Sequence, residues 1–181
     1  MHFKILDSYE KESQKNDIVK ILTDSDRDFV PPLSSRNSTL DKSFLSESSS
    51  GDGINSYYDA MKDQEIIAAI EGDAIVGIVS YRLDFLSDEI TEADIPNIYV
   101  STLVLDKGVR GKGITKRMYS YLFGELYADR NIFTRTWSTN FAHIKILGDF
   151  GFSEIIRKID DRGKGIDTVY YKRPPAKILK L

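Results

Sequence analysis

The most constraining feature of this sequence is an apolar strand that leads through a glycine-rich turn into an amphipathic helix. Residues 98–105 are strongly apolar, and residues 106–113 contain three glycines. The helix that follows, over 113–127, carries an apolar stripe made of Ile114, Met118, Leu122 and Leu126. A buried strand followed directly by a helix is typical of domains in which strands and helices share one sheet, so we expect an α/β or α+β fold.

Patterns typical of strands and patterns typical of amphipathic helices alternate along the rest of the chain. Apolar runs and period-two patterns predict strands at 3–6, 64–70, 74–85, 98–105, 132–137, 153–159 and 166–172. Helical spacing predicts helices near 18–22 and over 54–61, 113–127 and 140–150. Two prolines at 31–32 end the first helical part, and the serine-rich residues 34–53 predict a long mobile loop.

Length and composition exclude several classes of protein and of functional site. The 181 residues predict one domain over 1–173 and a basic tail over 174–181. The absence of cysteine excludes a disulfide scaffold, a zinc finger and thiol catalysis, and with two histidines we expect no metal. The formal charge of −3 argues against a nucleic-acid or membrane partner. No signal-peptide or transmembrane pattern is visible, so a cytoplasmic location is expected.

The glycine-rich turn has the properties of an anion site. The first amides of a helix lack an acceptor within the helix, and the helix dipole places about half a positive charge there. Glycine also lets a bulky anion approach the backbone closely. Residues 107–117 contain five basic side chains and no acidic one, although the whole protein is acidic. The sequence therefore predicts a phosphate site here, with a solvated basic turn as the alternative.

Two common phosphate motifs do not fit this turn. Gly108 and Gly113 have the separation of a P-loop, but Ile114 stands where that loop needs its lysine. A dinucleotide fingerprint that begins at Gly111 would place Lys116 where the third glycine belongs. The turn therefore indicates a different kind of phosphate ligand.

Two further sequence spacings indicate which phosphate-bearing ligand this turn binds. Residues 110–115 read Arg-x-x-Gly-x-Thr at the start of a helix, and Asn140 is followed eleven residues later by Gly-Phe at 151–152. With these features, residues 98–172 resemble the GNAT superfamily of acyl-CoA-dependent N-acyltransferases, whose signature is Arg/Gln-x-x-Gly-x-Gly/Ala. Thr115 departs from the small residue that usually ends this signature.

The resemblance implies both a fold and a cofactor site. The expected fold is a mixed, mostly antiparallel sheet flanked by helices, in which a central pair of strands splays apart. The pantetheine arm of acetyl-CoA inserts between those strands in such proteins. Carried over to this sequence, the backbone of Leu103 and Leu105 and the side chain of Asn140 would contact that arm. The pyrophosphate would be held by the amides of Arg110, Gly111, Lys112, Gly113, Ile114 and Thr115, with Lys112 and Lys116 screening its charge.

The resemblance further implies transfer of an acetyl group from acetyl-CoA, as co-substrate, to the primary amine of an unidentified acceptor. Direct attack is expected, because no cysteine is present to carry an acyl intermediate. Many family members have a tyrosine proton donor seven residues after the asparagine, but Leu147 stands there. The catalytic residues therefore stay unidentified. A non-catalytic acyl-CoA-binding or regulatory module of the same fold is the alternative, and the oligomeric state stays open, a homodimer included.

For several other candidate residues, a structural role has to be weighed against a functional one. His143 lies on an apolar helical stripe, so a partly buried, hydrogen-bonded histidine is favoured over a catalytic one. Ser101 and Thr102 occupy the strand where relatives often carry a base, but a hydroxyl can at best position a water. An acidic segment precedes that strand and would either attract a cationic acceptor or lie in solvent; its acids are Asp88, Glu89, Glu92 and Asp94. A nucleic-acid-binding module that uses residues 107–117 is a further rival, disfavoured because no aromatic residue interrupts the basic patch.

Overall fold

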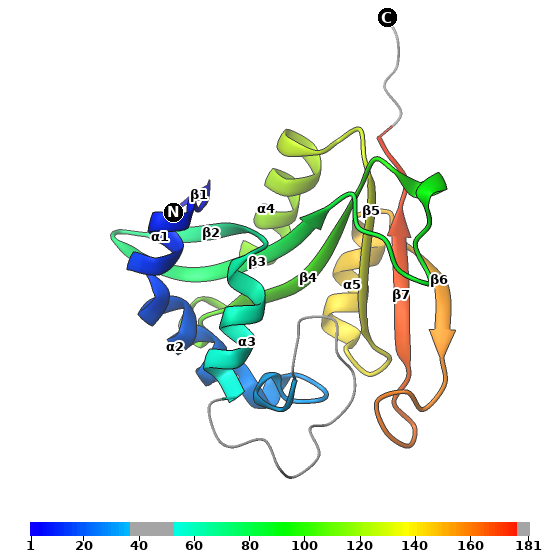
Figure 1. Ribbon diagram of the computed structural model, residues 1–181, viewed down its shortest axis with the longest axis horizontal. Helices are drawn as coiled ribbons and strands as arrows, with labels where there is room; N and C mark the ends of the chain where they lie inside the picture. The colour runs from blue at the N-terminus through cyan, green and yellow to red at the C-terminus, as the bar shows by residue number, and fades with distance from the viewer. Residues whose placement is uncertain (37–52, 177–181) are drawn as a thin grey trace, which may run out of the picture. The chain divides into compact units, whose positions relative to one another are not determined.

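The computed structural model describes residues 1–36 and 53–176 of the chain (Figure 1). Its strands are β1 (His2–Ile5), β2 (Glu65–Glu71), β3 (Ala74–Leu83), β4 (Asn97–Leu105), β5 (Asn131–Trp137), β6 (Ser153–Lys158) and β7 (Thr168–Arg173). They form one sheet in the order β1-β2-β3-β4-β5-β7-β6. The β4–β5 pair is parallel, whereas β1–β2, β2–β3, β5–β7 and β6–β7 are antiparallel. The predicted mixed, mostly antiparallel sheet is therefore confirmed.

Within residues 1–36 and 53–176, five α-helices connect and flank the strands: α1 (Ser8–Ser13), α2 (Lys15–Ser25), α3 (Gly53–Lys62), α4 (Ile114–Ser120) and α5 (Phe141–Asp149). The predicted helix over 113–127 is present, but its second half, Tyr121–Leu126, is a π-helix. Helix α1 was not expected from apolar spacing. Its signal is a capping box, in which Asp7 accepts from the Glu10 amide at 2.8 Å and Glu10 accepts from the Asp7 amide at 3.1 Å.

Parts of two predictions fall outside the described residues. Only the first and last residues of the serine-rich stretch 34–53 are described: a 3-10 turn covers Leu33–Ser35, and Gly53 begins α3. Of the basic tail, residues 177–181 are not described. Within the described ranges, no helix is both long enough and apolar enough to cross a membrane.

The chain divides into two compact units. The first contains Met1–Tyr81 and Ser101–Met118, and the second contains Arg82–Val100 and Tyr119–Leu181. The division therefore falls within β4 and within the helical segment that begins at Ile114. The expectation of a single domain over 1–173 stays a prediction.

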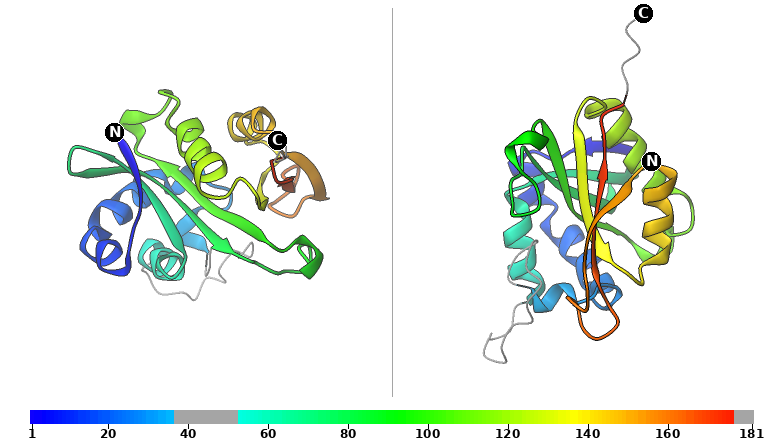
Figure 2. Two further views of the ribbon diagram at one scale, coloured as in Figure 1. Left: turned by 90° about the horizontal axis from the view of Figure 1, so that it is seen from above. Right: turned by 90° about the vertical axis from the view of Figure 1, so that its right-hand side faces the viewer.

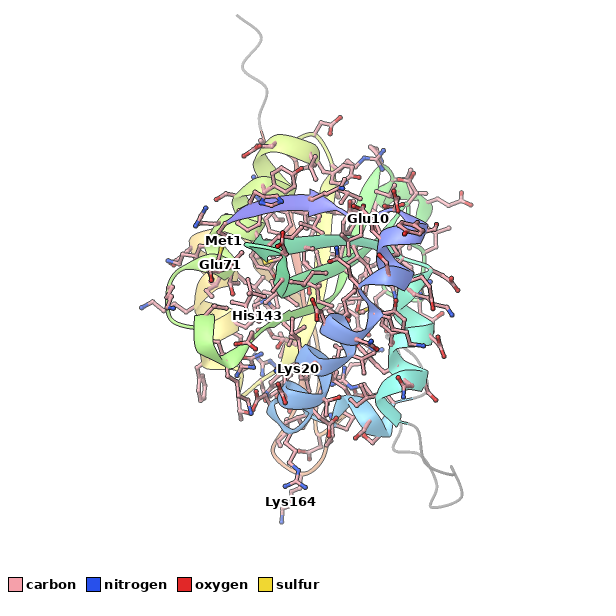
Figure 3. The ribbon with its side chains drawn as sticks, turned by 90° about the vertical axis from the view of Figure 1, so that its left-hand side faces the viewer. Met1, Glu10, Lys20, Glu71, His143 and Lys164 are labelled. Carbon is pink, nitrogen blue, oxygen red and sulfur yellow. The ribbon has the colours of Figure 1, made fainter. Side chains whose placement is uncertain are left out.

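In the first unit, α1, α2 and α3 cover one face of β1–β3, and the beginning of α4 lies on the opposite face (Figure 2). Helix α2 buries a stripe of side chains at spacings of three and four, which is the pattern its sequence predicts. Helix α3 completes this layer with Tyr57, Tyr58 and Met61, all fully buried. Figure 3 labels Glu10, the α1 residue that forms an ion pair with Lys4 of β1.

In the second unit, α5 lies along one face of β5, β7 and β6 (Figure 2). The helical segment after Met118 adds an aromatic layer, in which Phe123 stacks on Tyr119 at 4.6 Å and meets the ring edge of Phe150 at 5.9 Å. The Tyr119 hydroxyl and His143 Nε2 lie 2.7 Å apart within this layer. The interpretation of His143 as a partly buried, hydrogen-bonded side chain is therefore confirmed (His143 is labelled in Figure 3).

Gly77 of β3 is required by close packing against β4. A Cβ atom there would lie 2.3 Å from Leu105 Cδ2 and 3.2 Å from the Val104 carbonyl oxygen. We expect Gly77→Ala to lower the free energy of unfolding by about 1–3 kcal/mol, because Leu105 must leave its rotamer or the strands must shift. Denaturant unfolding measures the loss. As a control, Gly124→Ala meets no atom within 4 Å and should be neutral or slightly stabilising.

His143 makes stability depend on pH. Burial lowers the pKa of His143 from 6.5 to about 4. Between these values the unfolded chain binds a proton that the folded protein does not, so stability falls as the pH falls. From pH 7 to pH 5 we expect the wild type to lose about 2 kcal/mol more than His143→Gln, measured by denaturant unfolding at both pH values.

The control for this experiment is His2→Gln, which removes the other histidine at an exposed position. This variant should keep the full pH dependence of the wild type. Equal pH dependence in the wild type and His143→Gln would show that the folded protein already accommodates a charged imidazole at position 143.

Candidate functional site

The turn between β4 and α4 is built to expose its backbone. Asp106 caps the 3-10 turn Lys107–Val109 by accepting from the Gly108 amide at 2.7 Å. Val109 and Ile114 are buried and anchor the two ends of the exposed residues 110–113. The first backbone bond of the helix runs from the Arg117 amide to the Gly113 carbonyl at 3.1 Å. The amides of Ile114 and Thr115 precede this bond and have no acceptor within the helix.

Gly111 and Gly113 give the turn its shape. Both have φ near +74°, a conformation that side chains with a Cβ rarely adopt. A Cβ built on either residue would meet no atom within 4 Å, so the space beside this backbone is open. A ligand can therefore approach the backbone closely on the side where these two residues lack a Cβ.

The side chain of Arg110 faces the protein rather than a ligand. Its Nε donates to the Leu105 carbonyl at 3.1 Å, its Nη1 forms an ion pair with Asp28 at 2.7 Å, and its Nη2 donates to the buried Ser25 hydroxyl at 2.7 Å. The guanidinium thus ties the turn to the end of β4 and to the end of α2. The expected contribution of Arg110 to a cofactor is its backbone amide, which in this structure donates to the Lys107 carbonyl at 3.4 Å.

The β4–β5 ladder is short. It joins Asn97 to Asn131 and ends with the pair Val100–Thr134, where the Thr134 hydroxyl donates to the Val100 carbonyl at 3.0 Å. Strand β4 continues through Leu103 to Leu105 in the first unit, and β5 continues to Trp137 in the second. Leu103 is half-buried. The Leu105 carbonyl accepts one hydrogen bond from Arg110, and its second lone pair can accept another.

Asn140 and the Gly-Phe pair form the two ends of α5. The Asn140 side chain caps the helix by accepting from the His143 amide at 3.4 Å, and it donates to the Thr136 hydroxyl at 3.0 Å. At the other end, Gly151 has φ +78°, and the Phe152 amide bonds back to the Leu147 carbonyl at 3.0 Å. This is a Schellman ending, which explains physically why glycine precedes phenylalanine. Asn140 belongs to the second unit, whereas the glycine turn belongs to the first.

The positions expected to supply acid–base groups hold buried or paired side chains. Leu147 of α5 is fully buried, and its aliphatic side chain offers no proton. The Thr102 hydroxyl lies 2.6 Å from the Tyr57 hydroxyl, and the Ser101 hydroxyl lies 2.5 Å from Gln64 Oε1. Sequence reasoning did not single out Tyr57 and Gln64, because only tertiary folding brings residues more than 35 positions apart to β4.

The acidic segment before β4 is partly neutralised by the second unit itself. Glu89 forms an ion pair with Lys158 of β6, and Asp94 forms one with Lys172 of β7 at 2.7 Å. The hydrogen bond from Lys172 lowers the pKa of Asp94. Asp88 and Glu92 are exposed. Two of the four carboxylates of this acidic segment are therefore already bound to lysines.

Comparison with known proteins agrees with this geometry. The family model described as "Acetyltransferase (GNAT) family" matches residues 32–152. No curated protein matches the sequence. Among solved structures, N-acetyltransferase from Staphylococcus aureus Mu50 is 18% identical with a TM-score of 0.64, and 96% of this chain and 97% of that chain are covered.

Two further structures show the same fold. Ribosomal-protein-alanine N-acetyltransferase from Brucella melitensis is 11% identical, with a TM-score of 0.65 and coverage of 96% of this chain and 99% of that chain. The yncA protein from Salmonella typhimurium, solved with its cofactor acetyl-CoA, is 14% identical, with a TM-score of 0.62 and coverage of 100% and 97%. Because the family model covers well over half of the sequence, the chain belongs to the GNAT family of acetyltransferases.

Proposed function

We propose that the protein transfers an acetyl group from acetyl-CoA to the primary amine of an acceptor. The observation that carries this proposal is the open, left-handed backbone at Gly111 and Gly113, directly before the first amides of α4. A pyrophosphate needs such an approach to backbone amides, and the neighbouring basic side chains favour its charge. Membership of the GNAT family supports acyl-CoA as the ligand that carries this pyrophosphate.

The proposed binding mode uses backbone groups more than side chains. The amides of residues 110–115 hold the pyrophosphate, and the exposed Lys112 lies beside it. Beyond the short β4–β5 ladder, the backbone of Leu103 and Leu105 offers hydrogen bonds to the pantetheine arm. The Asn140 amide adds a contact through the second hydrogen of its Nδ2, because the first is donated to Thr136.

Acetyl-CoA supplies a thioester whose thiolate leaves readily, so the protein needs mainly to position the acceptor. Direct attack by the amine fits a chain that has no cysteine to carry an acyl group. Holding an amine next to the thioester carbonyl can by itself contribute several kcal/mol to catalysis. We assign no proton donor, since Leu147 is buried and apolar.

The second candidate is a non-catalytic acyl-CoA-binding or regulatory module. The observation that favours it is Leu147, which stands where a proton donor is common in the family and is fully buried. Steady-state assays with acetyl-CoA and a broad set of primary amines separate the two. Tight cofactor binding without turnover would support the module and contradict the enzyme.

Acetyl-CoA should stabilise the protein through the glycine turn. At about a hundredfold excess over its dissociation constant, we expect it to raise the free energy of unfolding by about 3 kcal/mol. Gly113→Asp should abolish this gain, because a carboxylate would crowd and repel the pyrophosphate. Denaturant unfolding with and without acetyl-CoA measures the gain.

The matched control is Gly72→Asp, in the turn between β2 and β3. Gly72 also has a positive φ, +62°, and a Cβ there also meets no atom within 4 Å. The two variants therefore introduce the same side chain at similar backbone conformations, but only one alters the turn. A normal acetyl-CoA response in Gly113→Asp would contradict the proposed phosphate site.

A further inference from the structure

Tyr99 of β4 is a buried tyrosine whose hydroxyl the folded chain does not use. The residue is 2% exposed, and the Phe85 ring packs against it with the two ring centroids 4.7 Å apart. Among the residues that the structure describes, none donates to the Tyr99 hydroxyl or accepts from it. Because this oxygen is unpartnered and yet is not one of the completely enclosed side-chain atoms of that part of the chain, a ligand can reach it.

Several other buried tyrosines bond their hydroxyls within the fold. Examples are Tyr57 with the Thr102 hydroxyl at 2.6 Å, Tyr58 with the Lys11 carbonyl at 2.7 Å and Tyr119 with His143 at 2.7 Å. A buried hydroxyl that stays unbonded costs free energy, and phenylalanine at the same position would avoid this cost. The Tyr99 hydroxyl therefore points to a partner outside the chain.

Tyr99 lies next to the point where the β4–β5 ladder ends (Figure 1). It pairs with Phe133, one position before the last pair of the ladder. Directly paired residues, and residues two apart on a strand, point to the same side of a sheet, so Tyr99, Phe133 and Arg135 share one face. The proposed pantetheine arm runs from the glycine turn back along β4 through Leu105 and Leu103. Its sulfur end therefore points toward this end of the ladder.

The surroundings of Tyr99 keep its hydroxyl protonated and offset the charge of a phenolate. Burial raises the pKa of Tyr99 to about 12, so the hydroxyl is a hydrogen-bond donor at neutral pH. The positive charges of Arg135 and Arg162 lower this pKa, whereas Tyr170 and Glu89 raise it. The two guanidinium groups would thus stabilise the negative charge that forms when a proton leaves Tyr99.

We propose that the Tyr99 hydroxyl bonds to the sulfur of the cofactor and donates the proton that the departing thiolate takes up. In this step the nitrogen–carbon bond forms, the carbon–sulfur bond breaks and the Tyr99 proton moves to the sulfur. The proton that the amine nitrogen loses then restores the phenol, so no further reactant is needed. This inference rests on the proposed function and adds to it the donor that Leu147 cannot supply.

The first test replaces Tyr99 by phenylalanine. Since Tyr99→Phe removes no hydrogen bond of the described chain, its unfolding midpoint in denaturant should equal or exceed that of the wild type. The kcat should fall about tenfold to a hundredfold, because a general acid is lost, while the KM of each substrate stays the same. The assay uses acetyl-CoA and the primary amine of the broad set that is acetylated fastest.

The matched control is Tyr58→Phe on α3. Tyr58 is also fully buried, but its hydroxyl donates to the Lys11 carbonyl at 2.7 Å. This variant should unfold at a lower denaturant concentration and keep the kcat of the wild type. An equal fall of kcat in both variants would show that altered packing is the cause, and it would overturn the inference.

The second test needs no acceptor and uses coenzyme A alone. The chain has no cysteine, so after subtraction of the ligand-free protein the ultraviolet absorbance of a thiolate comes only from the coenzyme. A donor on the sulfur favours the thiolate, so bound coenzyme A should be about tenfold to a hundredfold more acidic in the wild type than in Tyr99→Phe. Equal acidity in the two proteins would contradict a bond between Tyr99 and the sulfur.

Calorimetry with acetyl-CoA separates this inference from the proposed function. The dissociation constant should be the same in the wild type, Tyr99→Phe and Tyr58→Phe. If the wild type binds acetyl-CoA and acetylates amines while Tyr99→Phe keeps the full kcat, the inference is overturned and the proposed function stands. If the wild type binds neither acetyl-CoA nor coenzyme A, both proposals fail together.

Discussion

The guanidinium of Arg110 is the contact on which the glycine turn depends. It joins the last carbonyl of β4, a buried hydroxyl at the end of α2 and a carboxylate in the 3-10 turn that follows. Two left-handed glycines, Gly111 and Gly113, would otherwise leave the turn free to sample many conformations. With both ends held, the backbone amides at the start of α4 keep a defined direction, and the space on the Cβ side of Gly111 and Gly113 is open.

Charge is distributed differently in the two units. In the first, Lys107, Lys112 and Lys116 are exposed and close in sequence to the exposed backbone of residues 110–113, which suits a ligand that carries phosphates. In the second, Lys158 and Lys172 pair with acids of the β3–β4 segment, and the half-buried Arg135 and the buried Arg162 donate to hydroxyls. A net charge of −3 conceals both arrangements, because acidic residues elsewhere outweigh them in the sum.

Most of the fold was predictable because its elements follow local patterns. The apolar stripe of α2, the β2–β3 turn at Gly72 and the glycine that ends α5 each depend on neighbours within a few residues. Helix α1 was missed although its capping box was readable, because apolar spacing alone was used. The π-helical turn after Ser120 could not be read, since its spacing resembles that of an α-helix. Residues 37–52 lie outside the described part, so the prediction of a mobile loop there stays a prediction.

The candidate site also has parts that local sequence patterns predict and parts that they do not. The turn at residues 110–115 and the ends of α5 were readable because short spacings set backbone conformation and helix capping. By itself the sequence thus determined the family, the kind of fold and the position of the proposed phosphate site. Only the tertiary structure decided that Arg110 faces inward, that Glu89 and Asp94 are bound by lysines, and that Arg135 and Arg162 share a face with aromatic rings. These facts depend on contacts between distant strands, and strand register, which no local pattern specifies, brings those side chains together.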